Sequence, residues 1–166
     1  MYVPFENLSD NARVWIYTAA QGLILKEENE IEKGLRGFAE SWQSHHKDIL
    51  ASFKIIKSRF IVVAADEAYN DVSGCGIDKS VHVIQDIENE LGISLTDKTL
   101  VCFDVQGRIQ AIPFQKIKEA VLQGRIEVDT YFYNTLIQTK AELSSQFYIT
   151  IKDGWVKRYF APVASV

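Results

Sequence analysis

The hydrophobic positions repeat with two different periods along the chain, and these periods predict its helices and strands. Ile31, Leu35, Phe38 and Trp42 are spaced by four, three and four residues, which predicts a helix from Lys26 to Ser44. Runs of branched and aromatic residues favour strands. They predict strands at 13–19, 52–56, 59–65, 99–104, 108–112, 131–133 and 147–151.

A second helix is predicted from about Ile77 to Leu91, where Gly92 stops it. Its inner face is expected to hold Ile77, Val81, Ile84 and Leu91, with Ser80 and Ile87 at the flank. A third helix should begin at Pro113 and end before Gly124. The segment 135–143 is also expected to be helical, and two-residue turns are expected at Lys57-Ser58 and Gln106-Gly107.

The order of these elements predicts an α+β fold. Up to the strand at 99–104 the chain runs β-α-β-β-α-β, which is the split βαβ, ferredoxin-like arrangement. A hairpin, a helix and a strand follow. We therefore expect a ferredoxin-like part over residues 1–98 and a smaller hairpin–helix–strand part over 99–166, packed together as one compact unit.

Composition narrows the classes of function. The chain has 166 residues, a net charge of -4 and a pI of about 5.4, which argues against general binding to nucleic acids or anionic membranes. The only cysteines are Cys75 and Cys102, so a reducing cytoplasm is the expected setting. We expect no signal peptide, membrane helix or cofactor.

The segment Ser73–His82 concentrates the chemistry of the chain. Gly74 and Gly76 flank a thiol just before the predicted second helix, and Asp78 and Lys79 follow. The first N–H groups of a helix lack intrahelical partners and favour anions. Ser73, Gly74, Gly76, Asp78 and Lys79 are therefore candidate ligand-binding residues for a small anionic ligand, a peptide or a protein.

An ATP-binding P-loop is not expected in this segment. Lys79-Ser80 resembles the end of that motif, but the two positions that require glycine hold Asp78 and Ser73. The apolar run with Asp66-Glu67, which resembles a Walker B strand, precedes the segment instead of following it. ATPase activity is therefore not predicted.

The alternative function is a thiol-dependent enzyme. Cys75 at a helix N-terminus near Lys79 could act as a nucleophile, with His82 as its general base. Asp78 and His82 also have metal-ligand spacing, but no third ligand is visible, so no metal site is predicted. Without a complete catalytic set, a binding or adaptor protein is expected rather than an enzyme.

The central motif Ser73-Gly74-Cys75-Gly76-Ile77-Asp78-Lys79-Ser80-Val81-His82, together with Arg13-Val14-Trp15-Ile16-Tyr17, resembles a small family of Bacteroidetes proteins. Met1-Tyr2-Val3-Pro4-Phe5 and Thr139-Lys140-Ala141-Glu142-Leu143 extend the resemblance over nearly the whole chain. Members of this family often carry the label "ABC transporter ATPase". The resemblance implies a cytoplasmic bacterial protein but not ATP hydrolysis, because the residues for that chemistry are missing.

The C-terminal half shows a looser resemblance, over about 30 residues, to GYF-like adaptor domains. Gln106-Gly107, Pro113-Phe114 and Gly124-Arg125-Ile126-Glu127-Val128-Asp129-Thr130 follow their hairpin–helix layout. The resemblance implies a binding surface made by aromatic residues. Candidates for it are Tyr131, Tyr133, Trp155 and Tyr159, and the alternative is that the terminal aromatics pack onto the body of the protein.

Overall fold

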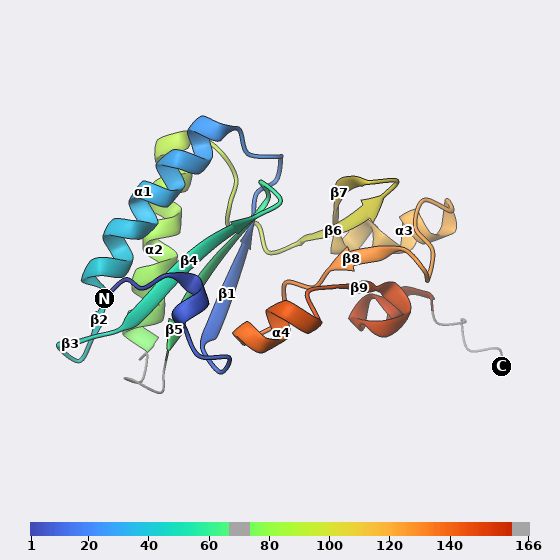
Figure 1. Cartoon of the computed structure of the whole chain (residues 1–166). Helices are drawn as coiled ribbons and strands as arrows, with labels where there is room; N and C mark the ends of the chain where they lie inside the picture. The colour runs from blue at the N-terminus through green and yellow to red at the C-terminus, as the bar shows by residue number, and fades with distance from the viewer. Residues whose placement is uncertain (67–73, 161–166) are drawn as a thin grey trace. The chain divides into compact units, whose positions relative to one another are not determined.

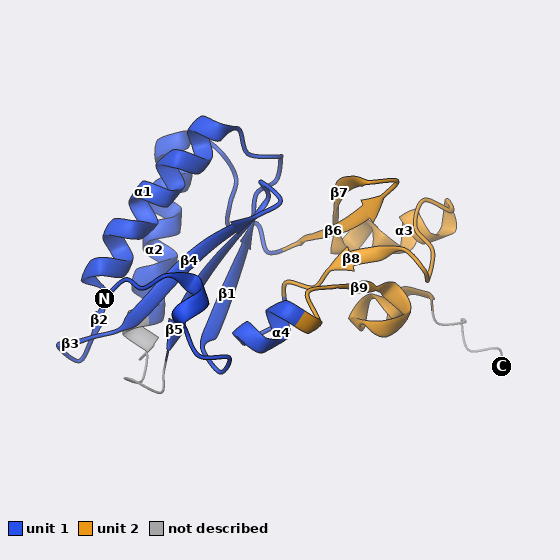
Figure 2. Cartoon of the chain, in the orientation of Figure 1, with its two compact units in different colours: residues 1–98, 136–144 blue, residues 99–135, 145–166 orange. Residues whose placement is uncertain are grey.

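The computed structural model describes residues 1–66 and 74–160, and the side chains of residues 74–76 lie outside this description. The chain divides into two compact units (Figure 2). Unit 1 comprises Met1–Lys98 and Leu136–Ser144, and unit 2 comprises Thr99–Thr135 and Ser145–Val166. Both contain helices and antiparallel sheet, so the predicted α+β class is confirmed.

Unit 1 is built on a three-stranded antiparallel sheet of order β1-β5-β4. Its strands are β1 (Arg13–Thr18), β4 (Leu50–Ile56) and the central β5 (Phe60–Asp66). Helices α1 (Leu25–Ser41) and α2 (Gly74–Leu91) run side by side along one face of this sheet (Figure 1). All seven residues of β5 are buried, which agrees with its predicted central position.

The core of unit 1 lies between the sheet and the two helices. Alternate residues of β5, Ile61 and Val63 among them, pack against the buried stripe of α1. Helix α2 buries Ile84 and Ile87 in the same cluster, and Ser80 is 1% exposed. Its buried stripe is therefore centred on Ser80 and Ile87, which were expected at the flank.

Two-residue turns close the hairpins of both units. Both residues have left-handed backbone angles at Lys57-Ser58 and at Gln106-Gly107, as the type I′ turn between twisted strands requires. His45-His46 form a third such turn, between β2 (Gln43–Ser44) and β3 (Lys47–Asp48). The helix predicted to reach Ser44 therefore ends at Ser41, because the chain enters this hairpin.

Two short segments, one at the N-terminus and one near residue 139, pair with the outer strands of the unit 1 sheet. Tyr2 bridges Ala51 of β4 in parallel, and Thr139 bridges Arg13 of β1 in antiparallel orientation. The Val14 N–H also donates to the Gln138 carbonyl at 2.9 Å. Residues 136–144 thus return to unit 1 after the chain has passed through unit 2, and they pair with the edge of β1.

The strand predicted to complete the ferredoxin-like order pairs elsewhere. Strand β6 (Leu100–Val105) belongs to a four-stranded sheet of order β7-β6-β8-β9 in unit 2. Its register with β7 places Phe103 opposite Gln110, and its register with β8 places Phe103 opposite Phe132. Unit 1 therefore holds five of the six elements of the split βαβ order.

The remaining elements of unit 2 cover the inner face of its sheet. Ile117 and Ala120 of one helix and Val156 near the chain end share a core with Phe103 and Phe132. The covering helix is α3 (Ile117–Leu122), and the other strands of the sheet are β7 (Arg108–Pro113), β8 (Tyr131–Tyr133) and β9 (Tyr148–Thr150). Helix α4 (Lys140–Ser145) lies mostly in unit 1. Short 3-10 helices occupy Phe5–Asn7, Phe114–Lys116, Ile151–Asp153 and Trp155–Phe160.

The end of α2 is held by one carboxylate. Gly92 has a left-handed φ of 66°, which ends the helix as predicted. The Glu88 carboxylate then accepts hydrogen bonds from the Leu95 N–H at 2.6 Å and the Thr96 N–H at 2.8 Å. Burial acts to raise the pKa of Glu88, but these hydrogen bonds outweigh it and lower the pKa. The loop after α2 is thereby fixed to the helix.

We predict that Lys140→Met destabilises the protein, because the Lys140 ammonium ties the returning segment to the N-terminal loop. Its Nζ donates to the Glu6 carbonyl at 3.0 Å and to the Leu8 carbonyl at 2.7 Å. Loss of these charged hydrogen bonds should lower the free energy of unfolding by about 1–3 kcal/mol. Urea denaturation measures this value. The control Lys152→Met removes an exposed ion pair and should change little; equal effects of the two variants would contradict the prediction.

Candidate functional site

The chemistry-rich segment lies at the start of α2. The helix begins at Gly74, three residues before the predicted start, so Gly74 and Gly76 are helical. The expectation that Gly74 and Gly76 lie before the helix is therefore wrong. The first residues of a helix donate no intrahelical hydrogen bond, so glycine can be accommodated there. Ser73 lies outside the described residues.

The next turns of α2 separate buried from exposed side chains. Asp78, Lys79 and His82 are exposed. Ser80 is buried, and its hydroxyl donates to the Ile77 carbonyl at 2.7 Å. The helix therefore presents one cation and one imidazole to solvent, three residues apart and on one face.

A residue of the sheet packs beside the first turns of α2. Tyr17 of β1 is buried, and its phenol lies near the Ser80 hydroxyl. Burial raises the pKa of Tyr17, and the neighbouring Ser80 hydroxyl lowers it in part. Because Ser80 lies beside Lys79, this buried contact also sets the direction in which the Lys79 side chain leaves the helix.

Lys79 and His82 line an open groove of about 260 Å³ between the end of α1 and the start of α2. This volume lies just below the ~300 Å³ at which small-molecule sites usually begin. It therefore suits a small ligand or one side chain of a partner. The other lining residues come from the end of α1, the following strand and α2: Phe38, Ser41, Trp42, Gln43 and Val83.

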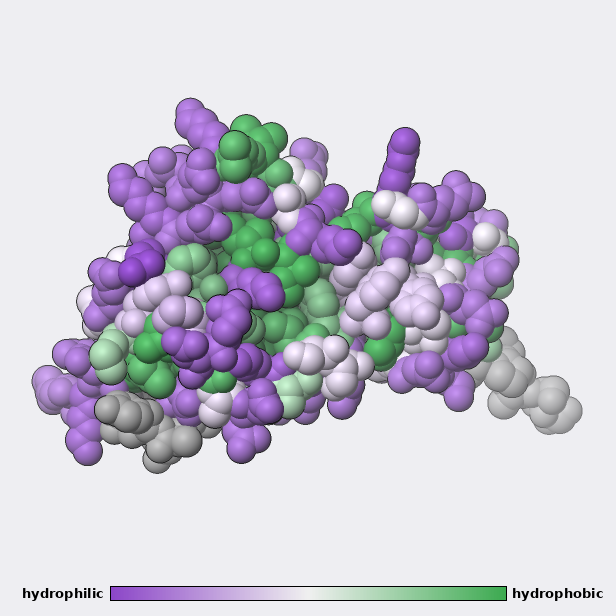
Figure 3. Space-filling view, viewed as in Figure 1, coloured by the Kyte–Doolittle hydropathy of each residue, from purple (hydrophilic) through white to green (hydrophobic). Residues whose placement is uncertain are grey.

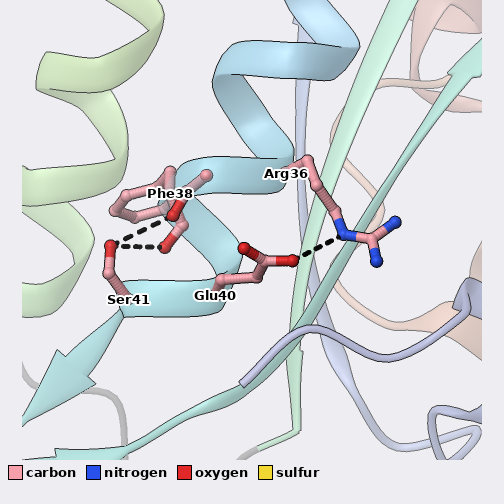
Figure 4. A network of polar contacts seen from close by, with 5 residues as sticks. Arg36, Phe38, Glu40 and Ser41 are labelled. Atoms are coloured by element: carbon pink, nitrogen blue, oxygen red, sulfur yellow. Dashed lines mark hydrogen bonds and ion pairs between the residues drawn. The ribbon is translucent and has the colours of Figure 1, made fainter.

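The wall of the groove on α1 is formed by the half-buried Phe38, with Trp42, which is only 1% exposed, packed behind it. The rings of Phe38 and Trp42 lie 4.8 Å apart between centroids. The Ser41 hydroxyl donates to the carbonyls of Gly37 and Phe38 at 3.1 and 3.3 Å. Figure 4 shows Ser41 on the side of α1 that faces α2, and the Arg36–Glu40 ion pair, at 3.0 Å, on another side. The ion pair therefore lies away from the groove.

The polar side chains of the groove differ in whether they have hydrogen-bond partners. Gln43 donates through Nε2 to Asp48 at 2.9 Å. Within the described part of the chain, neither the Lys79 ammonium nor the His82 imidazole has a hydrogen-bond or ion-pair partner. Asp78 is exposed on the same turn and lowers the local positive charge. The groove thus combines a cation, an imidazole and an aromatic wall.

Cys75 and His82 both belong to α2. They are seven residues apart on α2, which corresponds to roughly 10 Å along the helix axis. Direct proton transfer between a thiol and an imidazole needs hydrogen-bond contact. Among the described residues, no group of three His, Cys, Asp or Glu side chains is arranged to hold a metal ion.

The aromatic residues predicted as a partner surface divide between core and surface. Tyr133 is buried, and Trp155 packs edge-on against Phe132 at 6.2 Å in the unit 2 core. Tyr159 also packs against this core. The aromatic residues near the chain end thus mostly pack onto the body of unit 2 and do not form a partner surface. Tyr131 is 44% exposed on the outer face of the sheet.

Tyr148, which the sequence analysis did not single out, completes an aromatic stack on that outer face. It is 45% exposed, and its ring lies 4.6 Å from that of Tyr131 and 5.0 Å from that of Tyr133. Its hydroxyl donates to Asp104 Oδ2 at 2.5 Å. Tyr148 lies on the same face of the sheet as Tyr131 and Tyr133, because β9 pairs with β8 so that Tyr148 is opposite Tyr133. The sequence alone does not reveal this pairing.

A third surface feature, at the beginning of α1, is apolar. Ile24 and Leu25, at the beginning of α1, are 61% and 72% exposed. Figure 3 shows green, apolar surface over this end of α1. Scattered exposed apolar residues are common on protein surfaces. No helix in the described ranges is both long enough and apolar enough to cross a membrane.

We predict that Tyr17 and Ser80 are energetically coupled. Tyr17→Phe and Ser80→Ala should each lower the free energy of unfolding by about 1–2 kcal/mol, because each change leaves a buried hydroxyl or carbonyl without its partner. The double variant should lose less than the sum of the two, by at least about 0.5 kcal/mol. Urea unfolding of the four proteins measures this coupling. Strict additivity would show that the two hydroxyls do not interact.

We predict that Tyr148 ionises late in an alkaline titration. The hydrogen bond to Asp104, followed by burial and the Asp104 charge, raises the pKa of Tyr148 to about 12. An unfolded tyrosine ionises near pH 10. The stability that this bond contributes is therefore present below about pH 10 and is lost as the pH rises toward 12. Tyrosinate absorbance, compared with that of Tyr148→Phe, should show one late-ionising phenol. An unshifted difference titration would contradict the prediction.

Comparison with known proteins found no matching family model, no similar curated protein and no similar solved structure. The two resemblances drawn from the sequence therefore stay predictions, and function has to be argued from the groove and the surface of this chain.

Proposed function

We propose that this protein is a small binding or adaptor protein whose ligand site is the groove between α1 and α2. The observation that carries the proposal is the exposed, unpartnered Lys79 and His82 of the described chain beside the Phe38–Trp42 wall. A cation beside aromatic rings suits a ligand with an anionic group and a flat apolar part. The ligand is a small aromatic acid or phosphate, or an acidic side chain of a partner.

The same geometry argues against an ATPase. Lys79 is the sixth residue of α2, roughly 7.5 Å along the axis from Gly74, and not at the first turn where a phosphate is cradled. The sheet of unit 1 is antiparallel throughout, whereas doubly wound nucleotide-binding folds use mostly parallel strands. Asp78, directly before Lys79, would oppose a polyphosphate.

Binding of phenyl phosphate and benzoate, followed by tryptophan fluorescence, tests the groove. Saturable quenching is expected, because Trp42 forms part of the wall. Lys79→Met should weaken binding by at least about fivefold, since it removes a charge-assisted contact. Asp78→Asn should strengthen binding. Lys33→Met, an exposed lysine elsewhere on α1, is the matched control and should leave the affinity unchanged.

Three outcomes would overturn the proposal. The first is absence of saturable binding, or binding that Lys79→Met does not affect. The second is robust ATP turnover that Lys79→Ala abolishes. The third is a Cys75 thiolate pKa well below 7, measured from the pH dependence of alkylation by iodoacetamide, which would favour the thiol-dependent enzyme. Because Cys102 is buried, slow labelling of Cys75→Ser would confirm that the signal reports Cys75.

A further inference from the structure

The outer face of the unit 2 sheet carries a second feature with its own chemistry. Tyr148 of β9 lies across β8, between the rings of Tyr131 and Tyr133, and its hydroxyl is held by Asp104 of β6. Three strands thereby fix one stack of rings. Tyr133 is buried, while Tyr131 and Tyr148 remain about half exposed. The stack is rigid, and part of its aromatic surface faces solvent.

Carboxylates surround the exposed part of this stack. Asp104 lies opposite Tyr131 in the strand register. Thr150, paired with Tyr131 on the other side, donates its hydroxyl to Asp153 at 2.9 Å. Asp129 also lies in this region, together with Lys152. A ring face is a region of negative potential, so rings and carboxylates reinforce one another.

The single lysine in this group does not cancel its negative charge. The Lys152 ammonium is bound by Asp129 at 2.9 Å, and its pKa is raised first by that hydrogen bond and then by the charges of Asp129, Asp153 and Tyr131. Asp104 accepts from the Gly107 N–H at 3.0 Å and from Tyr148. It forms no ion pair within the described residues, and a carboxylate has acceptor positions for about four hydrogen bonds.

We infer that the Tyr131–Tyr148 surface docks an arginine side chain of a partner peptide. A guanidinium is planar and weakly hydrated, and it stacks on aromatic faces while donating to carboxylates. The exposed ring of Tyr131 provides the stacking surface. Asp104, opposite Tyr131 on β6, and Asp153, which accepts a hydrogen bond from Thr150 of β9, provide acceptors. Lysine, a compact and strongly hydrated charge, fits this arrangement less well.

NMR titration of the full-length protein with a capped Gly-Gly-Arg-Gly-Gly peptide tests this inference. Shifts are expected at the amides of Tyr131, Tyr148 and Thr150. Replacing arginine with citrulline keeps the shape and removes the charge, and it should weaken binding by about tenfold. This peptide comparison uses the wild-type chain, so it does not depend on any variant folding.

Variants then locate the contact. Tyr131→Leu, which keeps apolar volume but removes the ring, should weaken binding by at least about fivefold, and Asp153→Asn should weaken it by about threefold. Glu119→Gln, the same loss of charge on α3, is the matched control. Equal binding of the arginine and citrulline peptides would overturn the inference, as would tighter binding of a proline-rich peptide at the same residues. Lys79→Met should leave this binding unchanged, which separates it from the groove of unit 1.

Discussion

The central strand β5 fixes the arrangement of unit 1, because every one of its seven residues is buried. A slip of such a strand by one residue would move every side chain to the opposite face of the sheet and disrupt the packing on both faces. Its register with β1 pairs Trp15 with Val63, and its register with β4 pairs Phe53 with the same residue. The three side chains on one face of the sheet then define the surface on which both helices pack. The positions of α1 and α2, and therefore the groove between them, follow from this strand.

The groove depends on a second, polar constraint. A helix packed only by apolar contacts can rotate by small amounts, since dispersion contacts are not directional. The hydrogen bond from the Ser80 hydroxyl to the Ile77 carbonyl is directional, and the buried Tyr17 phenol lies near it, at the end of α2 that carries Lys79. At the other end, Glu88 fixes the loop that leaves the helix. Polar contacts at both ends of α2 thus hold the helix that carries Lys79 and His82, the side chains on which the proposed function rests.

The two units carry different kinds of recognition surface. In unit 1 the cation of Lys79 stands beside an aromatic wall, which favours an anionic ligand. In unit 2 the rings of Tyr131 and Tyr148 stand among carboxylates, which favours a cationic one. The proposed adaptor function would use these two surfaces for separate partners, because each would reject the ligand of the other by charge.

Local sequence patterns predicted most of the helices and strands, the turns at Lys57-Ser58 and Gln106-Gly107, and the α+β class. These features are local: periodicity, turn residues and stop signals act within a few positions. The helix ends were less well predicted. The helix expected over 135–143 is wrong before Lys140, because Thr139 pairs with Arg13 of β1 instead. Neither the hairpin at His45-His46 nor the start of α2 at Gly74 has a strong local signal.

Only the tertiary structure decided which distant segments meet. The pattern of β6 is the same whether it pairs in one sheet or the other, so its place beside β8 was not predictable. The sequence placed Phe38 and Trp42 on the hydrophobic stripe of one helix and Lys79 and His82 on another helix, but it contained no sign that they line one groove. Tyr148 likewise meets Asp104 only through the order of the strands. Contacts between residues far apart in the chain depend on the packing of whole elements, and packing leaves no short-range pattern to recognise.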